Sequence, residues 1–291
     1  MNPAGYSYTP LSARPGGTWP NGARLAVVVC VGVESYRFGS GHTEDVIADV
    51  SAPDLVNTAW RDYGNRIGAF RLFELCARLG IPPTVLLNTD VYDEAPDVLE
   101  AARKVSAEIV GHGRSNSDSL AGMAPEAERA YLADVADRIR VQEGQAPGGW
   151  SSPWLTQTPA TLDLLAATGY EYLLDLRFDD QPVWLHTESG PLLAIPYAAE
   201  LNDSSTMVGR SVLARDFADM IDDEFAELHA AAAHTPLVMS VVLHSFISGV
   251  PFRLRAVGRA LERIATAEDV WLTTPRQIHR AVVESPELFG E

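Results

Sequence analysis

The sequence predicts an α/β fold built on a parallel β-sheet. Short apolar segments rich in β-branched residues alternate along the chain with longer segments that show helical spacing. The apolar segments are continuous rather than alternating, as is typical of parallel strands covered on both faces. Polar residues follow the carboxyl ends of these strands: Glu34, Asn88, His112, Asp175 and His244. In an α/β barrel this edge of the sheet carries the active site.

The first half of the chain contains three predicted strands and two predicted helices. Residues 24–33 predict a buried strand, because almost every residue there is apolar. Residues 63–79 predict a helix with its apolar side chains near one face, and Gly80 ends it. Residues 39–57 are a long polar insertion, expected to be a loop over the site or at an interface. Further elements are a strand at 83–88, a helix at 96–105 and a strand at 107–110.

The second half continues the same alternation. Helices are expected at 125–143, 158–168, 217–233 and 252–266, and strands at 170–176 and 237–243, the latter ending at His244. The length of 291 residues suits one large domain of the barrel type. We therefore expect an N-terminal extension over residues 1–22 and a single domain over residues 23–291.

Charge and composition exclude several classes of partner. The chain has 39 acidic and 22 basic residues, a net charge of -17. Such a surface repels phosphate backbones and anionic lipids, so we expect no nucleic-acid or membrane partner. Because the first 20 residues lack the basic and apolar regions of a signal peptide, we expect a cytoplasmic location. Cys30 and Cys76 lie in apolar segments and are expected to be buried free thiols.

The segment 108–116 holds the clearest candidate for chemistry. An apolar strand ends at His112, which lies between two glycines, and Asn116 follows four residues later. A histidine with a second ligand at this spacing is a common way to hold a metal, although asparagine is a weak ligand. A turn or helix-capping role for Asn116 is nearly as well supported by the sequence.

Several segments in a fixed order resemble those of one family. The chain resembles the polysaccharide deacetylase (NodB-like, carbohydrate esterase family 4) superfamily, and most of all its allantoinase-like and cyclic-imide-hydrolase-like branch. The resemblance runs from about residue 19 to about residue 281. The segments that carry it are 28–35, 63–88, 108–117, 148–175, 179–184, 195–203 and 243–253. The resemblance implies a distorted (β/α) barrel, hydrolysis of an amide carbon–nitrogen bond, and a homo-oligomer, either a dimer or a tetramer.

The chain departs from the typical sugar-deacetylase pattern in a correlated way. Gly32 stands where the family has its base aspartate, and Glu34 where it has a metal-binding aspartate. His112 keeps the first metal histidine, but Asn116 replaces the second. The third motif, at residues 149–154, lacks the arginine that orients the base. Loss of the base together with its orienting residue is what a changed mechanism would leave behind.

The retained residues point to acid–base chemistry. The resemblance implies that His244 is a general acid and that Asp175 braces it, which would hold one imidazole tautomer. Glu34 and His112 could hold a divalent metal such as zinc with Asn116, or they could position water directly. Catalytic zinc usually has three protein ligands, so metal-dependent and metal-independent mechanisms both remain open.

A further group of residues is expected to contact the substrate. Trp150 and Trp154 lie in a loop rich in Gly, Ser and Pro and could form an apolar wall for a flat ring, or they could be core residues. The resemblance also suggests Asp179, Asp180 and Asn202, for which ordinary turn roles are the alternative.

Together these observations predict a hydrolase that opens a small cyclic amide, imide or ureide. The expected partner is a small-molecule substrate. Two alternatives remain: a deacetylase of polysaccharides or N-acetyl sugars, and a catalytically silent binding module. Loss of the base, its arginine and one metal histidine favours the silent module, whereas retention of Asp175 and His244 favours an enzyme.

Overall fold

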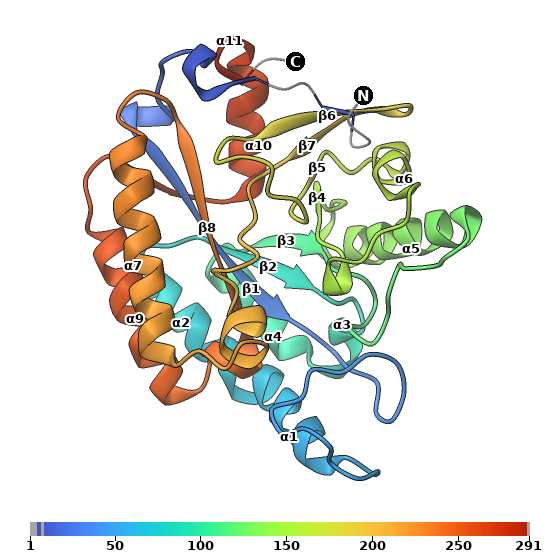
Figure 1. The fold of residues 1–291 in the computed structure, drawn as a ribbon. Coiled ribbons are helices and arrows are strands. Elements are labelled where there is room, and N and C mark those ends of the chain that lie inside the picture. The colour runs from blue at the N-terminus through green and yellow to red at the C-terminus, as the bar shows by residue number, and fades with distance from the viewer. Residues whose placement is uncertain (1–4, 7–8, 290–291) are drawn as a thin grey trace.

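The computed structural model describes residues 5–6 and 9–289 and shows one α/β domain (Figure 1). Nine strands form a single sheet in the order β6-β7-β5-β4-β3-β2-β1-β8, and β9 pairs with β1. All pairings are parallel except the β6–β7 hairpin. The strands are β1 (Leu25–Val33), β2 (Pro83–Leu87), β3 (Glu108–Gly111), β4 (Gly149–Trp150), β5 (Tyr172–Leu173), β6 (Val183–Thr187), β7 (Gly190–Ala194), β8 (Leu237–His244) and β9 (Val270–Thr273).

The central strand β1 fixes the register of the sheet. All nine of its residues are buried, in agreement with its continuous apolar sequence. It pairs with β8 from Leu25↔Leu237 to Gly32↔His244, and its second half pairs with β2. Because these strands are parallel and in register, their carboxyl ends meet at one edge of the sheet.

The sheet curls into a barrel that closes only loosely. The outer edge of β8 meets irregular backbone rather than a strand: Val238 N donates to Asp180 O (2.8 Å), and Val242 N donates to Leu201 O (2.9 Å). Asn202 and Val242 form an isolated parallel bridge. This incomplete closure confirms the predicted distorted (β/α) barrel.

The helices pack around the sheet and mostly match the predicted ranges. They are α1 (Leu55–Tyr63), α2 (Ala69–Leu79), α3 (Val91–Glu94), α4 (Pro96–Lys104), α5 (Pro125–Glu143), α6 (Thr161–Thr168), α7 (Ala214–Ala231), α8 (Ser245–Ser248), α9 (Pro251–Ala265), α10 (Pro275–Glu284) and α11 (Pro286–Phe289). The sequence did not predict the strands β4, β6, β7 and β9 or the helices α1, α3, α8, α10 and α11. The strand β4 has two residues, too few for a periodic pattern to show. No helix in the described part of the chain is both long and apolar enough to cross a membrane.

The structure describes the end of the predicted N-terminal extension and both cysteines. Residues 1–4 and 7–8 of the predicted extension lie outside the described residues. The end of the extension packs against the barrel, because Trp19 is buried and its Nε1 donates to Leu237 O (2.7 Å). Cys30 and Cys76 are both free and buried, as predicted.

The predicted helix over residues 63–79 is divided by a π-helical segment, Gly64–Gly68. Its glycines allow a close approach to α8, the short helix that follows β8. A Cβ atom on Gly68 would lie 1.9 Å from the Ser245 carbonyl oxygen, and one on Gly64 would lie 2.5 Å from the Ser245 hydroxyl. Only residues without a side chain fit there, so this contact fixes the segment directly after His244.

We expect Gly68→Ala to destabilise the protein by about 1–3 kcal/mol, the usual cost of forcing extra volume into a packed contact. The backbone at Gly68 is ordinary right-handed helix, so steric overlap rather than backbone strain is the cause. Urea unfolding measures the change. The matched control is Gly258→Ala in α9, where the new methyl would lie at an ordinary 3.4 Å from Leu75. Equal stabilities for the two variants would contradict the assigned role of Gly68.

Candidate active site

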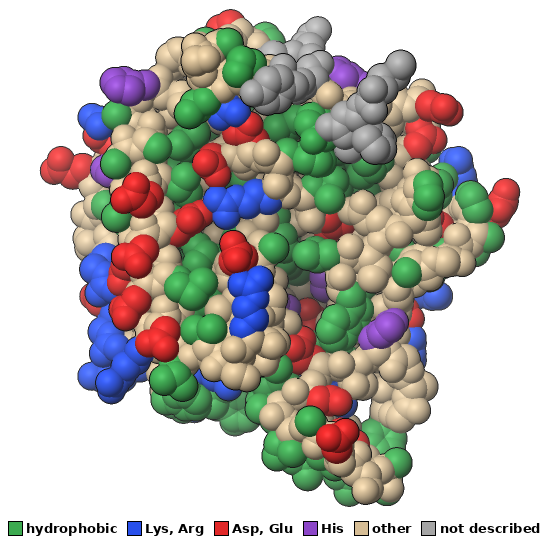
Figure 2. All heavy atoms as spheres, in the orientation of Figure 1, with side chains coloured by type: hydrophobic (Ala, Val, Ile, Leu, Met, Phe, Trp, Pro, Cys, Tyr) green, Lys and Arg blue, Asp and Glu red, His purple; other side chains and the backbone are tan. Residues whose placement is uncertain are grey.

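Three strand ends bring Glu34, His112 and His244 together at the carboxyl edge of the sheet. Glu34 follows β1, His112 follows β3, and His244 ends β8. These three residues are 5%, 5% and 8% exposed, respectively. Glu34 Oε1 lies 3.3 Å from His244 Nε2 and 3.5 Å from His112 Nε2. Figure 2 shows histidine atoms recessed in a hollow near the middle of the face in view.

The second oxygen of Glu34 accepts two hydrogen bonds. Tyr36 donates its hydroxyl to Glu34 Oε2 (2.6 Å), and Asn116 Nδ2 donates to the same oxygen (2.9 Å). Asn116 Nδ2 also donates to the Tyr36 hydroxyl (2.7 Å). Burial alone would raise the pKa of Glu34, but the charge of His244 and contacts with both histidines hold this pKa well below its usual range. Glu34 is therefore a buried carboxylate anion. Sequence reasoning missed Tyr36, for which only its position two residues after Glu34 was a signal.

Asp203, and not Asp175, braces His244. Asp203 Oδ1 lies 2.6 Å from His244 Nδ1, and the His244 backbone N–H donates to both Asp203 oxygens (3.0 and 2.9 Å). Ser248 donates its hydroxyl to Asp203 Oδ2 (2.5 Å). Burial would lower the pKa of His244, but Glu34 and Asp203 outweigh it and raise this pKa well above its usual value. The predicted Asp175–His244 pair is wrong because β8 carries His244 to Asp203, on the other side of the barrel.

Asp175 instead supports His112 through the loop after β4. Its Oδ1 accepts from Ser152 N (2.7 Å) and its Oδ2 from Gln157 Nε2 (2.9 Å). Burial raises the pKa of Asp175, and these hydrogen bonds offset part of the increase. In the same loop the Ser151 carbonyl lies 2.8 Å from His112 Nδ1. A carbonyl can only accept, so Nδ1 carries the proton and Nε2 faces Glu34.

Asn88 joins the ends of β1 and β3. Its Oδ1 accepts from Ser35 N (3.0 Å), and its Nδ2 donates to the His112 carbonyl. Side-chain hydrogen bonds of this kind satisfy backbone groups that the end of a strand leaves free. The relative positions of Glu34 and His112 are therefore set by backbone contacts as well as by their side chains.

Several known proteins resemble this chain in sequence and in fold. No family model matches the chain. A Schizosaccharomyces pombe protein named "Putative polysaccharide deacetylase" is 24% identical over 90% of this chain and 91% of its own. The crystal structure of PuuE allantoinase is 25% identical, with a TM-score of 0.86 over 98% of this chain and 97% of that one. A Pseudomonas aeruginosa "probable Polysaccharide deacetylase" structure is 24% identical with the same TM-score, over 98% of both chains, and shares the fold.

Over most of its length the chain is similar to proteins named as polysaccharide deacetylases and to an allantoinase. An allantoinase stands among its structural relatives, as the predicted allantoinase-like branch requires. Similarity to these proteins supports the expectation of a hydrolase that acts on amide carbon–nitrogen bonds.

The site leaves little room for a side chain at Gly32. A Cβ there would lie 3.0 Å from His244 Cδ2 and 3.3 Å from Glu34 Oε1. The imidazole of His244 thus fills the space that the family's base aspartate would need. The glycine at position 32 is therefore matched to the close packing of His244 and Glu34 around it.

The predicted metal ligands do not fit a metal ion well. The amide of Asn116 turns its N–H groups, not its oxygen, toward Glu34; the opposite orientation would place two oxygens against each other. Asn116 Oδ1 is buried and has no hydrogen-bond partner among the described residues. Across the described part of the chain, no group of three or more His, Cys, Asp or Glu side chains is placed to hold a metal ion. A neutral hydrogen-bond donor occupies the place of the second metal histidine.

The two tryptophans of the third motif have different environments. Trp150 is fully buried in the core, and its Nε1 donates to Ser152 Oγ (2.9 Å), so it forms no wall for a substrate. Trp154 is 37% exposed, and its Nε1 donates to the Asn116 carbonyl (2.6 Å). Its ring centroid lies 5.9 Å from that of His42. Trp154 therefore lies at the rim of the site, and its role as an apolar wall stays a prediction.

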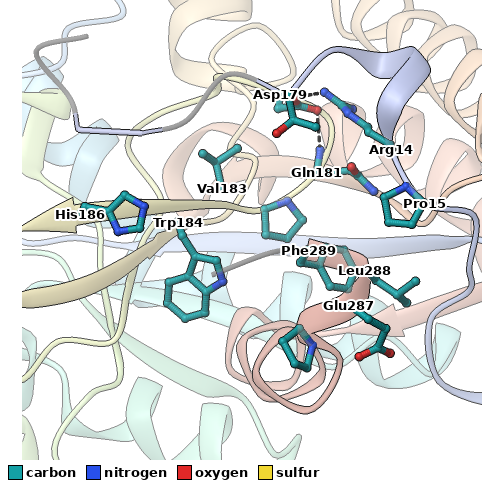
Figure 3. A pocket seen from close by; sticks show the side chains of 13 residues that line it. Arg14, Pro15, Asp179, Gln181, Val183, Trp184, His186, Glu287, Leu288 and Phe289 are labelled. Carbon is teal, nitrogen blue, oxygen red and sulfur yellow. Dashed lines mark hydrogen bonds and ion pairs between the residues drawn. The ribbon is translucent and has the colours of Figure 1, made fainter. Parts of the chain in front are cut away.

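Asp179 and Asp180 lie at the opposite edge of the sheet. Asp179 pairs with Arg14, and the Asp180 carbonyl accepts from Val238 at the start of β8, far along the strand from His244. Figure 3 shows Asp179 and Arg14 in a pocket beside Trp184, His186 and the C-terminal helix. The predicted substrate contacts of these two aspartates are therefore corrected to structural roles.

Asn202 lies beside β8, directly before Asp203, where it orders the turn that carries the brace of His244. Its Oδ1 accepts from Ser204 N (3.0 Å), which orders the turn that carries Asp203. The structure thus places Asn202 one residue from the histidine brace, and its contact with a substrate stays a prediction.

Replacing Asp203 by Asn should lower the pKa of His244, because a neutral amide no longer stabilises the imidazolium while burial still opposes it. A histidine titration followed by NMR measures the shift in both proteins. Asp175→Asn is the matched control and should leave the His244 titration close to that of the wild type. A larger shift in the Asp175 variant than in the Asp203 variant would restore the original pairing.

Proposed function

We propose that this protein hydrolyses a small cyclic amide, imide or ureide by acid–base chemistry between two histidines. One observation carries the proposal: His244 is held between the carboxylates of Glu34 and Asp203, and His112 lies on the other side of Glu34. Amide hydrolysis needs a group that takes a proton from water and another that gives a proton to the leaving nitrogen. The two histidines can divide these tasks.

His112 acts as the base in this proposal. Because Nδ1–H is directed at the Ser151 carbonyl, Nε2 is the nitrogen that can accept a proton from water. The hydroxide oxygen then attacks the carbonyl carbon of the ring. Glu34 remains ionised next to His112 and stabilises the imidazolium that forms there. Its depressed pKa makes Glu34 a poor base but a stable counter-charge.

His244 acts as the acid. Its raised pKa keeps it protonated, and the Nε2–H faces the same space as His112 Nε2. As the carbon–nitrogen bond breaks, this proton passes to the leaving nitrogen, which stays on the ring-opened product. Asp203 holds the other ring nitrogen and so fixes the orientation of the acid.

Burial of the site favours a small substrate over a polymer. Glu34, His112 and His244 are all nearly inaccessible. A polysaccharide needs an open groove through which the chain can pass on both sides of the reacting unit. The retained, fully hydrogen-bonded His244–Asp203 pair favours an enzyme over a silent binding module, because a binding module gains nothing from such a costly buried group.

Activation of water by side chains fits this site better than activation by a metal. Glu34 Oε2 already accepts two hydrogen bonds, and Asn116 presents donors rather than a lone pair. A protonated His244 cannot be a ligand. We therefore propose hydrolysis without a required divalent ion.

Purified protein should open the rings of hydantoin, succinimide or allantoin faster than it deacetylates N-acetylglucosamine oligomers. His244→Ala should reduce kcat about 10²- to 10⁴-fold, the usual contribution of a positioned acid or base. His229→Ala on the exposed side of α7 is the matched control and should retain activity. A preference for the N-acetyl sugars would replace the proposed substrate class, and full activity of His244→Ala would remove this residue from the mechanism.

Prolonged dialysis against a chelator should leave ring-opening activity within about twofold of the untreated enzyme, since no step requires a metal in the proposed mechanism. Elemental analysis of the dialysed protein shows whether any ion remains. Activity that disappears with a stoichiometric ion, and returns when that ion is added, would contradict the proposal.

A further inference from the structure

The segment of residues 39–54 contacts two parts of the chain that border the site, Ser117 and Ser204. At one end, His42 N donates to the Ser117 carbonyl (3.1 Å), directly after Asn116 in the chain. A Cβ on Gly41 would lie 2.3 Å from the same carbonyl oxygen, and Gly41 has a φ of +78°. Only glycine permits this approach in this conformation. The segment then passes to the opposite side of the barrel, where Glu44 contacts Ser204.

Two side chains of α1 hold the segment in place. Asn57, which is fully buried, accepts from Val46 N and Ile47 N (both 3.0 Å) and donates to the Ile47 carbonyl (2.9 Å). Arg61 donates from one nitrogen to the Glu44 carbonyl and to Asp45 Oδ1 (both 2.7 Å). The backbone on both sides of Glu44 is therefore fixed by hydrogen bonds.

The side chain of Glu44 contacts the turn that carries Asp203, the brace of the proposed acid. It is 9% exposed, and its Oε2 accepts from the Ser204 hydroxyl (2.7 Å). Ser204 directly follows Asp203, which braces His244. Burial raises the pKa of Glu44, the charge of His244 offsets part of this, and Glu34 and Asp203 add to the increase. No side chain or backbone N–H in the described part of the chain donates to Glu44 Oε1, and this oxygen is not sealed from solvent.

Among the described residues, only one oxygen of the Glu44 carboxylate has a hydrogen-bond donor, the Ser204 hydroxyl. The carboxylates of Glu34 and Asp203 contact the imidazole of His244, and the Glu44 carboxylate contacts Ser204, the residue after Asp203. Buried charged groups are stable only when their oxygens receive hydrogen bonds. Those of Glu34 and Asp203 come from the protein, whereas Glu44 Oε1 depends on whatever enters the site.

We propose that Glu44 is a substrate-binding residue that accepts a hydrogen bond from a second N–H group of the substrate. This inference rests on the proposed function and narrows it. The substrate is then a cyclic ureide, a ring in which a second nitrogen carries an N–H besides the nitrogen that leaves; a simple imide such as succinimide lacks this group. A ring without a second N–H leaves the Glu44 carboxylate unpaired and binds poorly.

Hydantoin, 1-methylhydantoin and 3-methylhydantoin test this contact, because each methyl group removes one N–H donor. Glu44→Gln should lower kcat/KM for hydantoin about 10- to 100-fold, mainly through KM, as expected for one hydrogen bond to a charged group. For the analogue that lacks the recognised N–H, wild type and variant should have the same kcat/KM. Asp45→Asn is the matched control: it loses the ion pair with Arg61 but keeps the Glu44 carboxylate, and it should show no such dependence on methylation.

The affinity for hydantoin, measured by calorimetry for the wild type and for Glu44→Gln, separates the proposed binding role of Glu44 from the proposed hydrolysis. Weaker binding to the variant supports the role of Glu44 even if turnover is absent, and absent turnover by itself overturns only the proposed function. Equal Kd values in the two proteins, or an equal loss for hydantoin and both methylated analogues, would overturn the role of Glu44.

Discussion

The site depends on one buried charge arrangement, an imidazolium between two carboxylates. Moving each charge of Glu34, His244 and Asp203 out of water costs several kcal/mol, and their attraction offsets this only where every remaining oxygen receives a hydrogen bond. Tyr36 and Asn116 donate to Glu34, and the rest of the donors come from Ser248 and the backbone of His244. The replacement of a metal histidine by Asn116 is thus consistent with the requirement for donors around Glu34.

The scaffold holds this arrangement through close contacts that larger residues would prevent. Gly32 leaves the space that the imidazole of His244 fills, and Gly68 lets its helix approach the backbone directly after His244. The helix α8 at this contact carries Ser248, which donates to the brace Asp203. A change in helix packing at Gly68 would therefore shift α8 and with it the contacts of Asp203 and His244. Stability and chemistry are coupled at this point of the fold.

The strand ends were predictable from sequence, but the pairing of side chains across the barrel was not. Continuous apolar runs located β1, β3 and β8, and parallel pairing then placed Glu34, His112 and His244 at one edge. Asp203 lies in irregular chain 41 residues before His244, where no periodicity marks which way a side chain points. Asp175 follows a strand of two residues and was the natural choice by resemblance. Which carboxylate meets the histidine depends on how the barrel closes, and that closure is made by irregular backbone contacts.

The charge of the site bears on release of the product as well as on choice of substrate. If Glu44 is ionised together with Glu34 and Asp203, one imidazolium leaves the site net negative. A neutral ring with N–H donors is attracted to such a site, whereas an anion is repelled. Hydrolysis of a cyclic amide or imide converts the ring carbonyl into a carboxylic acid, which ionises near neutral pH. Repulsion between this new carboxylate and the surrounding ones favours departure of the product and opposes ring closure. The same buried negative charge that requires donors for binding thus gives the proposed reaction its direction.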